Sequence, residues 1–441
     1  MPAVSDERAD VLHSWCVQAQ WDAPTIVGGR GAHFFDADGR DYLDMSSLAE
    51  CSNLGHQHRS VVRAIRDQAE RLCFVTSAWG ARPRAELGRA LLDKSGFEGG
   101  RVYFTLGGAD ANEHAVKFAR QTRGIADGLV VSRDRSYHGA TYACMEWSGD
   151  ARTNAAPAAD SRNVAKVPPP YAYRCPYGST DAVECGRRAV AAVASTLDAH
   201  GAERCAAVLM EPNAGTNGIV APDNYWPGLR EVTSARGVWL IADEIMSGFG
   251  RCGEWFAWQR HGEAGRPDLM TLAKGLTGAH MPLGAVVVSA PVAQRLEHEM
   301  LNTGLTYCGH PLACAAGLAA IAAYEDEALI ERSRRLGSGM LKAVQAMQSR
   351  VPSIGDVRGG HGLFVVVELV RDRATREPLA PWPQSPPLLK KLVARALQGG
   401  VSFATRGNLI LLAPPLVIEE NELADALALL ERLLLELNTE V

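Results

Sequence analysis

One lysine interrupts the apolar stretch LMTLAKGLTG, residues 269–278, in which Lys274 is the only charged residue among ten. Lysine is among the residues least often buried in proteins, and burial lowers the pKa of its amine. Such a lysine either extends its ammonium to solvent or serves as a reactive amine. The residues that the rest of the chain places beside it decide between these readings.

An acidic pair precedes this lysine. Asp243 and Glu244 end the apolar segment GVWLIADE, 31 residues before Lys274 counted from Asp243. A carboxylate at the end of a buried strand is costly unless a cation or local backbone N–H groups meet it, so a ligand, an internal arginine and plain backbone satisfaction are all open. Because Lys274 follows the neighbouring strand PDLMTLA, we expect its amine and the carboxylate to face the same side.

A third feature is the small-residue turn in TLGGADANEHAVKFAR, where Gly107, Gly108 and Ala109 stand between a strand and a helix. Small residues there allow backbone N–H groups and the positive end of the helix dipole to approach an anion such as phosphate. The turn lacks both the P-loop and the G-x-G-x-x-G pattern. Taken alone, a Gly-Gly turn between a strand and a helix is more often an ordinary tight turn than a phosphate site.

Together these features match the requirements of pyridoxal 5'-phosphate. Its aldehyde takes a lysine as a Schiff base, its ring nitrogen needs an acid, and its phosphate needs N–H donors. The segment SYHG adds Tyr137 and His138 after another strand. The Tyr137 ring is suited to stack on the pyridine face, although a tyrosine that caps the edge of the core is the alternative.

The elements expected to position these residues alternate along the chain. Short β-branched runs end in Gly, Asp or Glu and precede helix-like segments, which predicts an α/β fold with a largely parallel sheet flanked by helices. Ligands in such sheets bind beyond the carboxyl ends of the strands. We expect strands at 101–106, 128–133, 206–212, 237–244 and 284–290, helices at 59–72, 85–92 and 419–437, and a hairpin that bends at residues 36–39.

Composition narrows the class of partner. Of 441 residues, 47% are hydrophobic and 22% charged, and 45 basic against 50 acidic residues give a net charge of -5. The sequence has no basic stripe and no long apolar run. We therefore expect no nucleic-acid partner, no membrane partner and a cytoplasmic location. The ten cysteines lack zinc spacing, and His56 and His58 are better read as part of a turn, so we assign no metal.

The ordered motifs resemble those of the class III pyridoxal-phosphate aminotransferases of fold type I. The resemblance runs from GAHFFDADGRDYLD and NLGHQH through GGADANEHAVKFAR, YHG, EPNAG and DEIMSGFGRCG to PDLMTLAKGLTGAHMPLGAV, TGLTYCGHPLACAAGLA and APPLVI. It implies a large cofactor-binding domain at 59–322 with a mostly parallel, seven-stranded sheet. It also implies a smaller α+β domain formed by residues 1–58 and 323–441.

The resemblance also implies roles for single residues. Lys274 would form the Schiff base and move the proton, Asp243 would pair with the pyridinium N–H, and Tyr137 would stack on the ring. Thr306 would reach the phosphate of a neighbouring subunit, which implies a homodimer with shared active sites, or a tetramer. The other residues implied at the cofactor are Gly107, Gly108, Ala109, His138, Glu211 and Met246.

Substrate recognition is where the chain departs from its relatives. Many ω-aminotransferases place a carboxylate-binding arginine about ten residues before the Pro-Pro pair, where this chain has Ala404, and the nearest candidate is Arg406. Arg406 is either the arginine that binds the substrate carboxylate or a surface arginine. Ser77 and Trp79, with Ala78 between them, are expected to line the substrate pocket by position in the family. The small-residue turn at Gly107–Ala109 and the loop that carries Arg406 are most similar to those of the taurine-pyruvate branch of this family.

The expected function is transfer of an amino group from a primary amine or ω-amino acid to a keto acid, with pyruvate favoured, by a ping-pong mechanism. A class III phospholyase that acts on a phosphorylated amino alcohol is the alternative enzyme. A scaffold that retained the fold without catalysis is the alternative outside enzymology, although folding does not require a lysine within that apolar run.

Overall fold

A central seven-stranded sheet forms the larger lobe of the computed structural model, which describes residues 5–154 and 163–438. Its strands follow the order β4-β12-β11-β10-β7-β5-β6, and β12 alone runs antiparallel to its neighbours. The fold prediction of a mostly parallel sheet is therefore confirmed. The bounds are β4 (Arg101–Thr105), β5 (Leu129–Arg133), β6 (Val164–Val167), β7 (Cys205–Met210), β10 (Trp239–Asp243), β11 (Leu269–Leu272) and β12 (Gly284–Val288).

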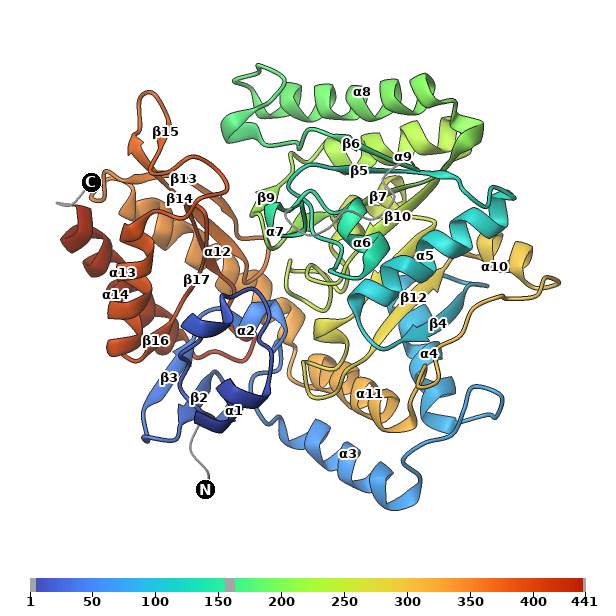
Figure 1. Cartoon of the computed structure of the whole chain (residues 1–441), viewed down its shortest axis with the longest axis horizontal. Helices are drawn as coiled ribbons and strands as arrows, with labels where there is room; N and C mark the ends of the chain where they lie inside the picture. Colours follow the sequence, from blue (N-terminus) through green and yellow to red (C-terminus); the bar gives the residue numbers. More distant parts are fainter. Residues whose placement is uncertain (1–4, 155–162, 439–441) are drawn as a thin grey trace.

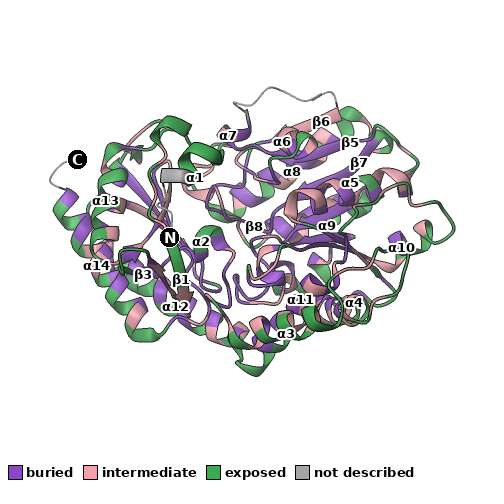
Figure 2. Cartoon of the chain, turned by 60° about the horizontal axis from the view of Figure 1, so that its bottom comes forward, coloured by how far each residue is buried: buried purple, intermediate pink, exposed green. Residues whose placement is uncertain are grey.

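Helices cover both faces of this sheet (Figure 1). On one face α5 (Gly108–Arg123) packs on β7, β11 and β12, and on the other α8 (Ala182–His200) and α9 (Tyr225–Ala235) pack on β5, β6 and β10. The strands read as continuous apolar runs because both of their faces are buried, as every residue of β5, β7, β11 and β12 is. Figure 2 shows this burial concentrated in the strands.

The smaller lobe joins the two ends of the chain. The N-terminal strands β1 (Ile26–Arg30), β2 (His33–Asp36) and β3 (Asp41–Asp44) form an antiparallel meander, and β16 (Val401–Ser402) adds to β3 in parallel. A second sheet contains β13 (Ile354–Gly359), β14 (Val365–Asp372), β15 (Glu377–Pro378), β17 (Ala404–Arg406) and β18 (Leu409–Leu412). The helices α12 (Leu329–Met347), α13 (Pro387–Gln398) and α14 (Glu420–Asn438) pack beside these sheets.

The remaining elements connect or flank the two lobes. The helix α11 (Pro311–Asp326) packs against α3 (Arg59–Arg71) and α4 (Arg82–Ser95), and it continues past the domain boundary expected at residue 323. The strand β6 was not predicted, because VAKV is too short to stand out in the sequence. Short elements complete the chain: α1 (Ser5–Asp10), α2 (Ser47–Glu50), α6 (Tyr142–Trp147), α7 (Ala151–Asn154), β8 (Asn213–Ala214), β9 (Ile219–Val220) and α10 (Ala290–Leu296).

Among the described residues, no helix combines the length and apolar character needed to cross a membrane.

One buried arginine ties the lobes together beside the cavity described below. The guanidinium of Arg251 is fully buried and donates hydrogen bonds to Leu363 O (2.8 Å) and Pro414 O (2.6 Å). It also donates to Ser47 Oγ and to Asn53 Oδ1, both at 2.8 Å. These four acceptors come from three separate stretches of the chain. Arg251 therefore sets where the N-terminal segment lies against the C-terminal lobe.

We expect Arg251→Met to lower the free energy of unfolding by about 3 kcal/mol or more, because four buried acceptors lose their donor. The measurement is urea unfolding followed by circular dichroism. The control is Arg334→Met, which removes an exposed ion pair with Glu254 and should change that free energy by no more than about 0.5 kcal/mol. Equal effects of the two substitutions would contradict the role assigned to Arg251.

Candidate active site

A cavity of about 240 Å³ lies at the carboxyl edge of the large sheet. It brings together eight of the residues expected at the cofactor from five different segments of the chain. Its lining is Gly108, Ala109, Tyr137, His138, Gly139, Ala140, Glu211, Gly215, Thr216, Asp243, Ile245, Met246, Ala273 and Lys274. The spatial meeting of Lys274 and Asp243 that the strand pattern predicted is present.

The residues meet because the parallel strands of the sheet end at this edge. The strand β4 leads into the turn at Gly107, β7 into Glu211, and β11 into Lys274, while β10 ends in Asp243 itself. The antiparallel β12 enters beside the turn, and a Cβ on Gly284 would lie 2.2 Å from Gly107 O. Glycine at position 284 therefore permits the close approach that seats the turn on the sheet.

The small-residue turn presents the first turn of α5 to the cavity. Gly108 begins the helix, and a Cβ there would lie 2.7 Å from Ile245 Cδ1, so a larger residue would require the Ile245 side chain to move. The first N–H groups of a helix have no intrahelical acceptor and carry partial positive charge. Gly107 precedes the helix as its N-cap and does not line the cavity. Of the three residues of the turn, Gly108 and Ala109 are those that line the cavity.

A hydrogen-bond network holds Asp243, which is almost fully buried. Asp243 Oδ2 accepts from Asn112 Nδ2 and faces His138 Nδ1, both at 2.8 Å, and Oδ1 accepts from the Ile245 N–H at 3.1 Å. Asn112 also donates to His138 O (2.9 Å), and its Oδ1 accepts from Thr271 Oγ1 (2.7 Å). The network fixes the carboxylate and leaves it facing the cavity.

Asn112 was missed by sequence reasoning, since an asparagine within a helix carries no signal of its own. His138 was expected at the cofactor without a stated contact, and the structure places it in the cavity lining with its Nδ1 against Asp243. Both residues position the carboxylate.

The two acids at the end of β10 have different surroundings. Glu244 points away from the cavity, where its oxygens accept from the backbone N–H groups of Ala257 (3.0 Å) and Trp258 (2.8 Å) and from Ser247 Oγ. Complete burial raises the pKa of Glu244 to about 7. Backbone N–H groups, one of the alternatives for this pair, therefore satisfy most of Glu244, whereas Asp243 takes one bond from the Ile245 N–H and is held otherwise by the side chains of Asn112 and His138.

A second buried acid, Glu211, meets the internal arginine of a neighbouring strand. Arg133 at the end of β5 donates from Nη2 to Glu211 Oε2 at 2.8 Å, with both side chains buried. Burial raises the pKa of Glu211, while the positive charge of Arg133 opposes that rise. Glu211 interacts electrostatically with His138 and Asp243 as well, so it is one of the charged groups that surround the cavity.

Tyr137 and Met246 form part of the cavity wall. The Tyr137 ring has the Arg152 guanidinium carbon 5.0 Å from its centroid, and burial raises the pKa of its hydroxyl. Met246 is buried, and a Cβ on Gly215 would lie 2.6 Å from Met246 Cγ. A glycine at 215 thus makes room for the methionine beside the space that a flat ring would occupy.

Lys274 begins a short 3-10 turn directly after β11, with a positive φ of 41°. Its Nζ lies 3.0 Å from Glu50 Oε2. The expectation that the apolar run lowers the pKa of this amine is wrong for the chain as it stands. Desolvation is the largest single influence and lowers that pKa, but the charges of Glu50, Cys51 and Asp243 and the hydrogen bond to Glu50 together outweigh it, so the pKa of Lys274 is raised.

Glu50 is the main site residue that sequence reasoning missed. It ends a run of four non-glycine residues, Ser47–Glu50, with φ between 43° and 69°. Left-handed conformations cost such residues roughly 1 kcal/mol each. The run is held by the hydrogen bond from Ser47 Oγ to Ala413 O (2.7 Å) and by the Arg251 bond. No local sequence rule predicts such a run, because tertiary contacts impose it.

Three predicted residues lie elsewhere in this chain. Ser77 and Trp79 line a separate hollow with Arg84, and the Trp79 side chain is 70% exposed. Thr306 is exposed in the loop before α11. Within one chain none of them reaches the Lys274 cavity, because each belongs to a surface loop on the outer side of α4 and α11.

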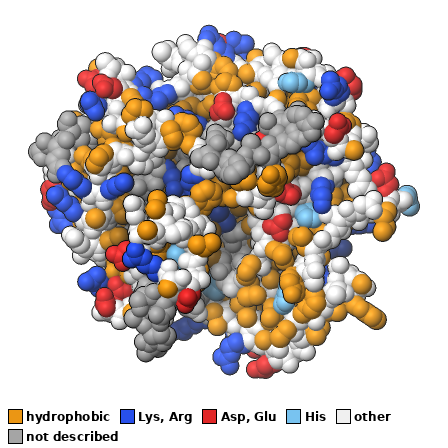
Figure 3. Space-filling view, in the orientation of Figure 1, with side chains coloured by type: hydrophobic (Ala, Val, Ile, Leu, Met, Phe, Trp, Pro, Cys, Tyr) orange, Lys and Arg blue, Asp and Glu red, His pale blue; other side chains and the backbone are white. Residues whose placement is uncertain are grey.

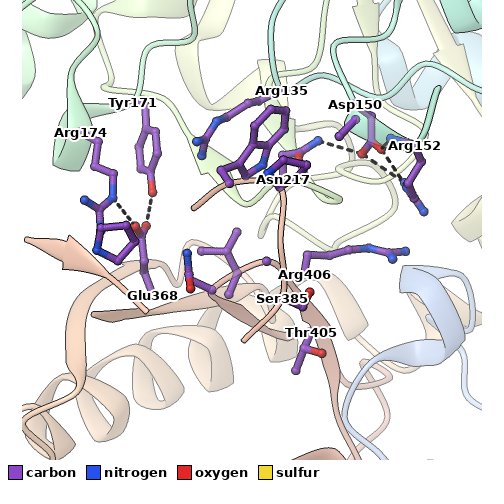
Figure 4. A pocket seen from close by; sticks show the side chains of 17 residues that line it. Arg135, Asp150, Arg152, Tyr171, Arg174, Asn217, Glu368, Ser385, Thr405 and Arg406 are labelled. Atoms are coloured by element: carbon purple, nitrogen blue, oxygen red, sulfur yellow. Dashed lines mark hydrogen bonds and ion pairs between the residues drawn. The ribbon is translucent and has the colours of Figure 1, made fainter. Parts of the chain in front are cut away.

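Arg406 lies on β17 in the smaller lobe, outside the lining of the Lys274 cavity. It lines the second cavity drawn in Figure 4, and it interacts electrostatically with Glu50 and Tyr137. The positive charge of Arg406 therefore acts on Glu50 and Tyr137, which lie at the Lys274 site.

The residues present fit pyridoxal phosphate. The cavity offers an amine, a fixed carboxylate and a helix N-terminus on different sides of a space bounded by Tyr137 and Met246. In addition, His138 Nε2 is buried and has no hydrogen-bond partner among the described residues. A buried polar atom without a partner is costly, which is consistent with a polar group beside it in the loaded site.

Comparisons with known proteins agree with this geometry. The family model of the class III aminotransferases matches residues 17–434. A leucine/methionine racemase from Thermococcus litoralis is 35% identical over 93% of this chain and 90% of its own length. A taurine–pyruvate aminotransferase from Bilophila wadsworthia is 29% identical over 96% of this chain and 95% of its own length.

Solved structures extend the likeness to the whole fold. The taurine:2-oxoglutarate aminotransferase from Bifidobacterium kashiwanohense, solved with pyridoxal phosphate and glutamate, superposes with a TM-score of 0.93 at 34% identity. The superposition covers 99% of this chain and 97% of that one. With a family model and a solved relative that each span nearly all of its length, the chain belongs to the class III aminotransferases, enzymes that depend on pyridoxal phosphate.

Proposed function

We propose that this aminotransferase takes its amino group from a primary amine or ω-amino acid and passes it to pyruvate in preference to other keto acids. The observation that carries the activity is the meeting of Lys274, Asp243 and the N-terminus of α5 in one cavity. The substrate preference is supported by relatives named taurine–pyruvate and putrescine–pyruvate aminotransferase, the latter from Pseudomonas aeruginosa and 30% identical.

When bound, pyridoxal phosphate supplies an electron sink that makes the proton on the substrate carbon acidic. The residues of the cavity would position the cofactor for this reaction. Asp243, fixed by Asn112 and His138, would keep a proton on the ring nitrogen by its negative charge. Gly108 and Ala109 would hold the phosphate with backbone N–H groups, and Tyr137 and Met246 would border the ring.

Lys274 moves the proton through Nζ. An amine that accepts a proton must first be neutral, and desolvation by the buried strand β11 favours that form. Glu50 opposes it as long as the two side chains are paired at 3.0 Å. The proton transfer therefore requires the Glu50 pairing to weaken, and Arg406 is a cation near enough to compensate the Glu50 charge.

We further propose a homodimer in which Ser77, Trp79 and Thr306 reach the active site of the partner. The two loops that carry them are joined by Arg84, which donates from Nε to Gly309 O (3.0 Å) and from Nη1 to Trp79 O (2.8 Å). Leu72, Trp79 and Tyr307 are large hydrophobic side chains exposed in this region. Figure 3 shows hydrophobic side chains gathered toward the lower right of the view, over the region of α4 and α11. An exposed apolar face of this kind is typical of an interface.

Neither alternative function is favoured by an observation. The relatives described above include no phospholyase, and a scaffold would not need an amine, a positioned carboxylate and a helix end around one cavity.

Lys274→Ala should abolish the visible absorption of the lysine-bound cofactor and lower turnover by about a hundred-fold or more, because the proton carrier is lost. Spectrophotometry with an amine donor and pyruvate measures both effects. Lys342→Ala, which changes an exposed lysine on α12, is the control. In the wild type, donor alone should convert the cofactor stoichiometrically to its aminated form. Release of inorganic phosphate, or racemisation of an amino acid without this conversion, would refute the transaminase proposal.

Glu50→Gln should lower the pKa of Lys274 in the cofactor-free protein, because desolvation then acts without the opposing negative charge. The half-maximal pH for labelling Lys274 with an amine-reactive reagent, followed by peptide mass spectrometry, should shift downward. Glu297→Gln, at an exposed position, should leave that pH unchanged. An unshifted midpoint in Glu50→Gln would show that Glu50 does not govern the amine.

Trp79→Asp should weaken the dimer and lower turnover most at low protein concentration, because a charge would be buried at the interface. Analytical ultracentrifugation and activity over a dilution series measure these effects. Val183→Asp, an exposed position on α8, is the control. A wild-type protein that is monomeric and fully active would contradict the shared site.

A further inference from the structure

Two free cysteines meet where a loop of the large lobe leads into α8. Cys175 directly follows the short 3-10 turn Ala172–Arg174, and Cys185 lies in the first turn of α8. The two thiols form a hydrogen bond with one another. Cys175 is partly exposed, whereas Cys185 is fully buried. A contact between an accessible thiol and a buried one is the arrangement from which a disulfide can form without a large backbone movement.

The loop between the two cysteines is held against α8 by hydrogen bonds. The Gly178 N–H donates to Cys175 O (3.1 Å), which closes a turn at the start of the loop. Arg188 of α8 donates from Nη1 to Tyr177 O (2.7 Å). The turn Ala172–Arg174 packs on α8 as well. The thiol contact therefore belongs to an ordered loop that is fixed to the helix on both sides of the turn.

The two thiols differ in acidity. Burial acts to raise the pKa of Cys175, but it is outweighed by other influences, so that pKa is lowered. These influences are hydrogen bonds from the Cys185 thiol and from the N–H groups of Ser179 and Tyr177, and the positive charge of Arg188. Burial and the contact with Cys175 raise the pKa of Cys185 to about 12. Cys175 is thus the thiol with the greater share of nucleophilic thiolate, and Cys185 is placed to react with its oxidised form.

Accessibility also distinguishes this pair from other thiols of the protein. Burial raises the pKa of four buried cysteines, which makes their thiols weak nucleophiles: Cys144, Cys205, Cys252 and Cys314. Figure 1 shows α8 on the opposite side of the large lobe from α4 and α11, the region of the proposed subunit interface. The partly exposed Cys175 is therefore open to a small oxidant in the proposed homodimer as well.

The segment that leads into the pair contacts the smaller lobe. Arg174 donates from Nε to Glu368 Oε1 (2.7 Å), and the Tyr171 hydroxyl donates to the same carboxylate. The guanidinium carbon of Arg135 lies 5.2 Å from the centroid of the Tyr171 ring and 4.7 Å from that of Trp382. A covalent bond from this segment to α8 would therefore restrain a stretch of chain that holds the two lobes together.

We propose that Cys175 and Cys185 form a reversible disulfide when the protein meets a hydroperoxide, and that this bond anchors the loop before α8. The Cys175 thiolate attacks one peroxide oxygen, the O–O bond breaks and hydroxide leaves, which converts Cys175 to a sulfenic acid. The Cys185 sulfur then attacks the Cys175 sulfur. The S–S bond forms, the S–O bond breaks, and the Cys185 proton leaves with the hydroxyl group as water.

The two thiols together lose two electrons, which the peroxide takes up. A dithiol reductant returns both thiols by thiol–disulfide exchange. The pair lies outside the Lys274 cavity, so the inference does not rest on the proposed function.

The test treats the full-length protein, loaded with pyridoxal phosphate, with increasing hydrogen peroxide. Trypsin releases both cysteines in one peptide, CPYGSTDAVECGR, residues 175–187. After oxidation this peptide should resist alkylation by iodoacetamide and weigh about 2 Da less than its reduced form, because two hydrogens are lost. Dithiothreitol should restore alkylation. The peroxide concentration that half-oxidises the peptide should be about tenfold or more below that for exposed Cys73.

Two variants separate the steps of the reaction. Cys175→Ser should abolish the disulfide. Cys185→Ser should stop at the sulfenic acid, which dimedone traps on Cys175. Cys73→Ser, at an exposed position, is the control and should leave the disulfide unchanged. Circular dichroism verifies that each variant is folded, and Cys175→Ser, at a partly exposed position, remains informative if Cys185→Ser does not fold.

Hydrogen–deuterium exchange tests the anchoring. Backbone amides of residues 171–181 should exchange several-fold more slowly in the oxidised wild type than in the reduced protein, because the disulfide restricts opening of the loop. Peroxide should leave their exchange unchanged in Cys175→Ser.

The proposal is overturned if the peptide 175–187 remains fully alkylated at peroxide concentrations that already oxidise Cys73. It is also overturned if a folded Cys185→Ser protein gives no dimedone adduct at Cys175, or if the disulfide forms without slowing exchange in residues 171–181. None of these measurements depends on turnover, so a failure of amino-group transfer would be recognised separately.

Discussion

Burying a carboxylate at the end of β10 is the constraint on which the rest of the site depends. A carboxylate removed from water must be met by hydrogen bonds or by a cation. Here Asn112 from α5, His138 from the loop after β5 and the Ile245 N–H all meet Asp243. The same contacts set the position of the helix whose N-terminus faces the cavity. The need to stabilise one charge therefore orders three segments around the space where the cofactor fits.

The pairing of Lys274 with Glu50 places a second constraint across the lobes. Glu50 ends the left-handed run Ser47–Glu50, which Arg251 of the larger lobe and Ala413 of the smaller lobe hold through hydrogen bonds with Ser47 Oγ. The energetic cost of this backbone is met by buried hydrogen bonds at the lobe junction. A residue near the N-terminus thus controls the charge state of the lysine at position 274, although the two are 224 residues apart.

Charge is distributed unevenly over the two neighbouring cavities. The Lys274 cavity combines one amine with Asp243 and Glu211, and the cavity that Arg406 lines has four arginines and two carboxylates. Since Tyr137 and Arg406 interact with groups on both sides, the two spaces share one electrostatic environment.

The amino-acid sequence by itself determined the sheet, the order of its strands along the chain and the reactive trio of Lys274, Asp243 and the Gly108 turn. Parallel strands place their carboxyl ends at one edge, so residues that follow strands can be grouped without coordinates. The tertiary structure alone decided the contacts between distant segments: Asn112 behind Asp243, Glu50 against Lys274, and Arg135 stacked on Trp382 across the lobes. These contacts have no local period or motif, because they arise where separate elements pack. The same reason explains why the sequence could not tell which of Asp243 and Glu244 faces the cavity, and why it overlooked the effect of Glu50 on the pKa of the lysine.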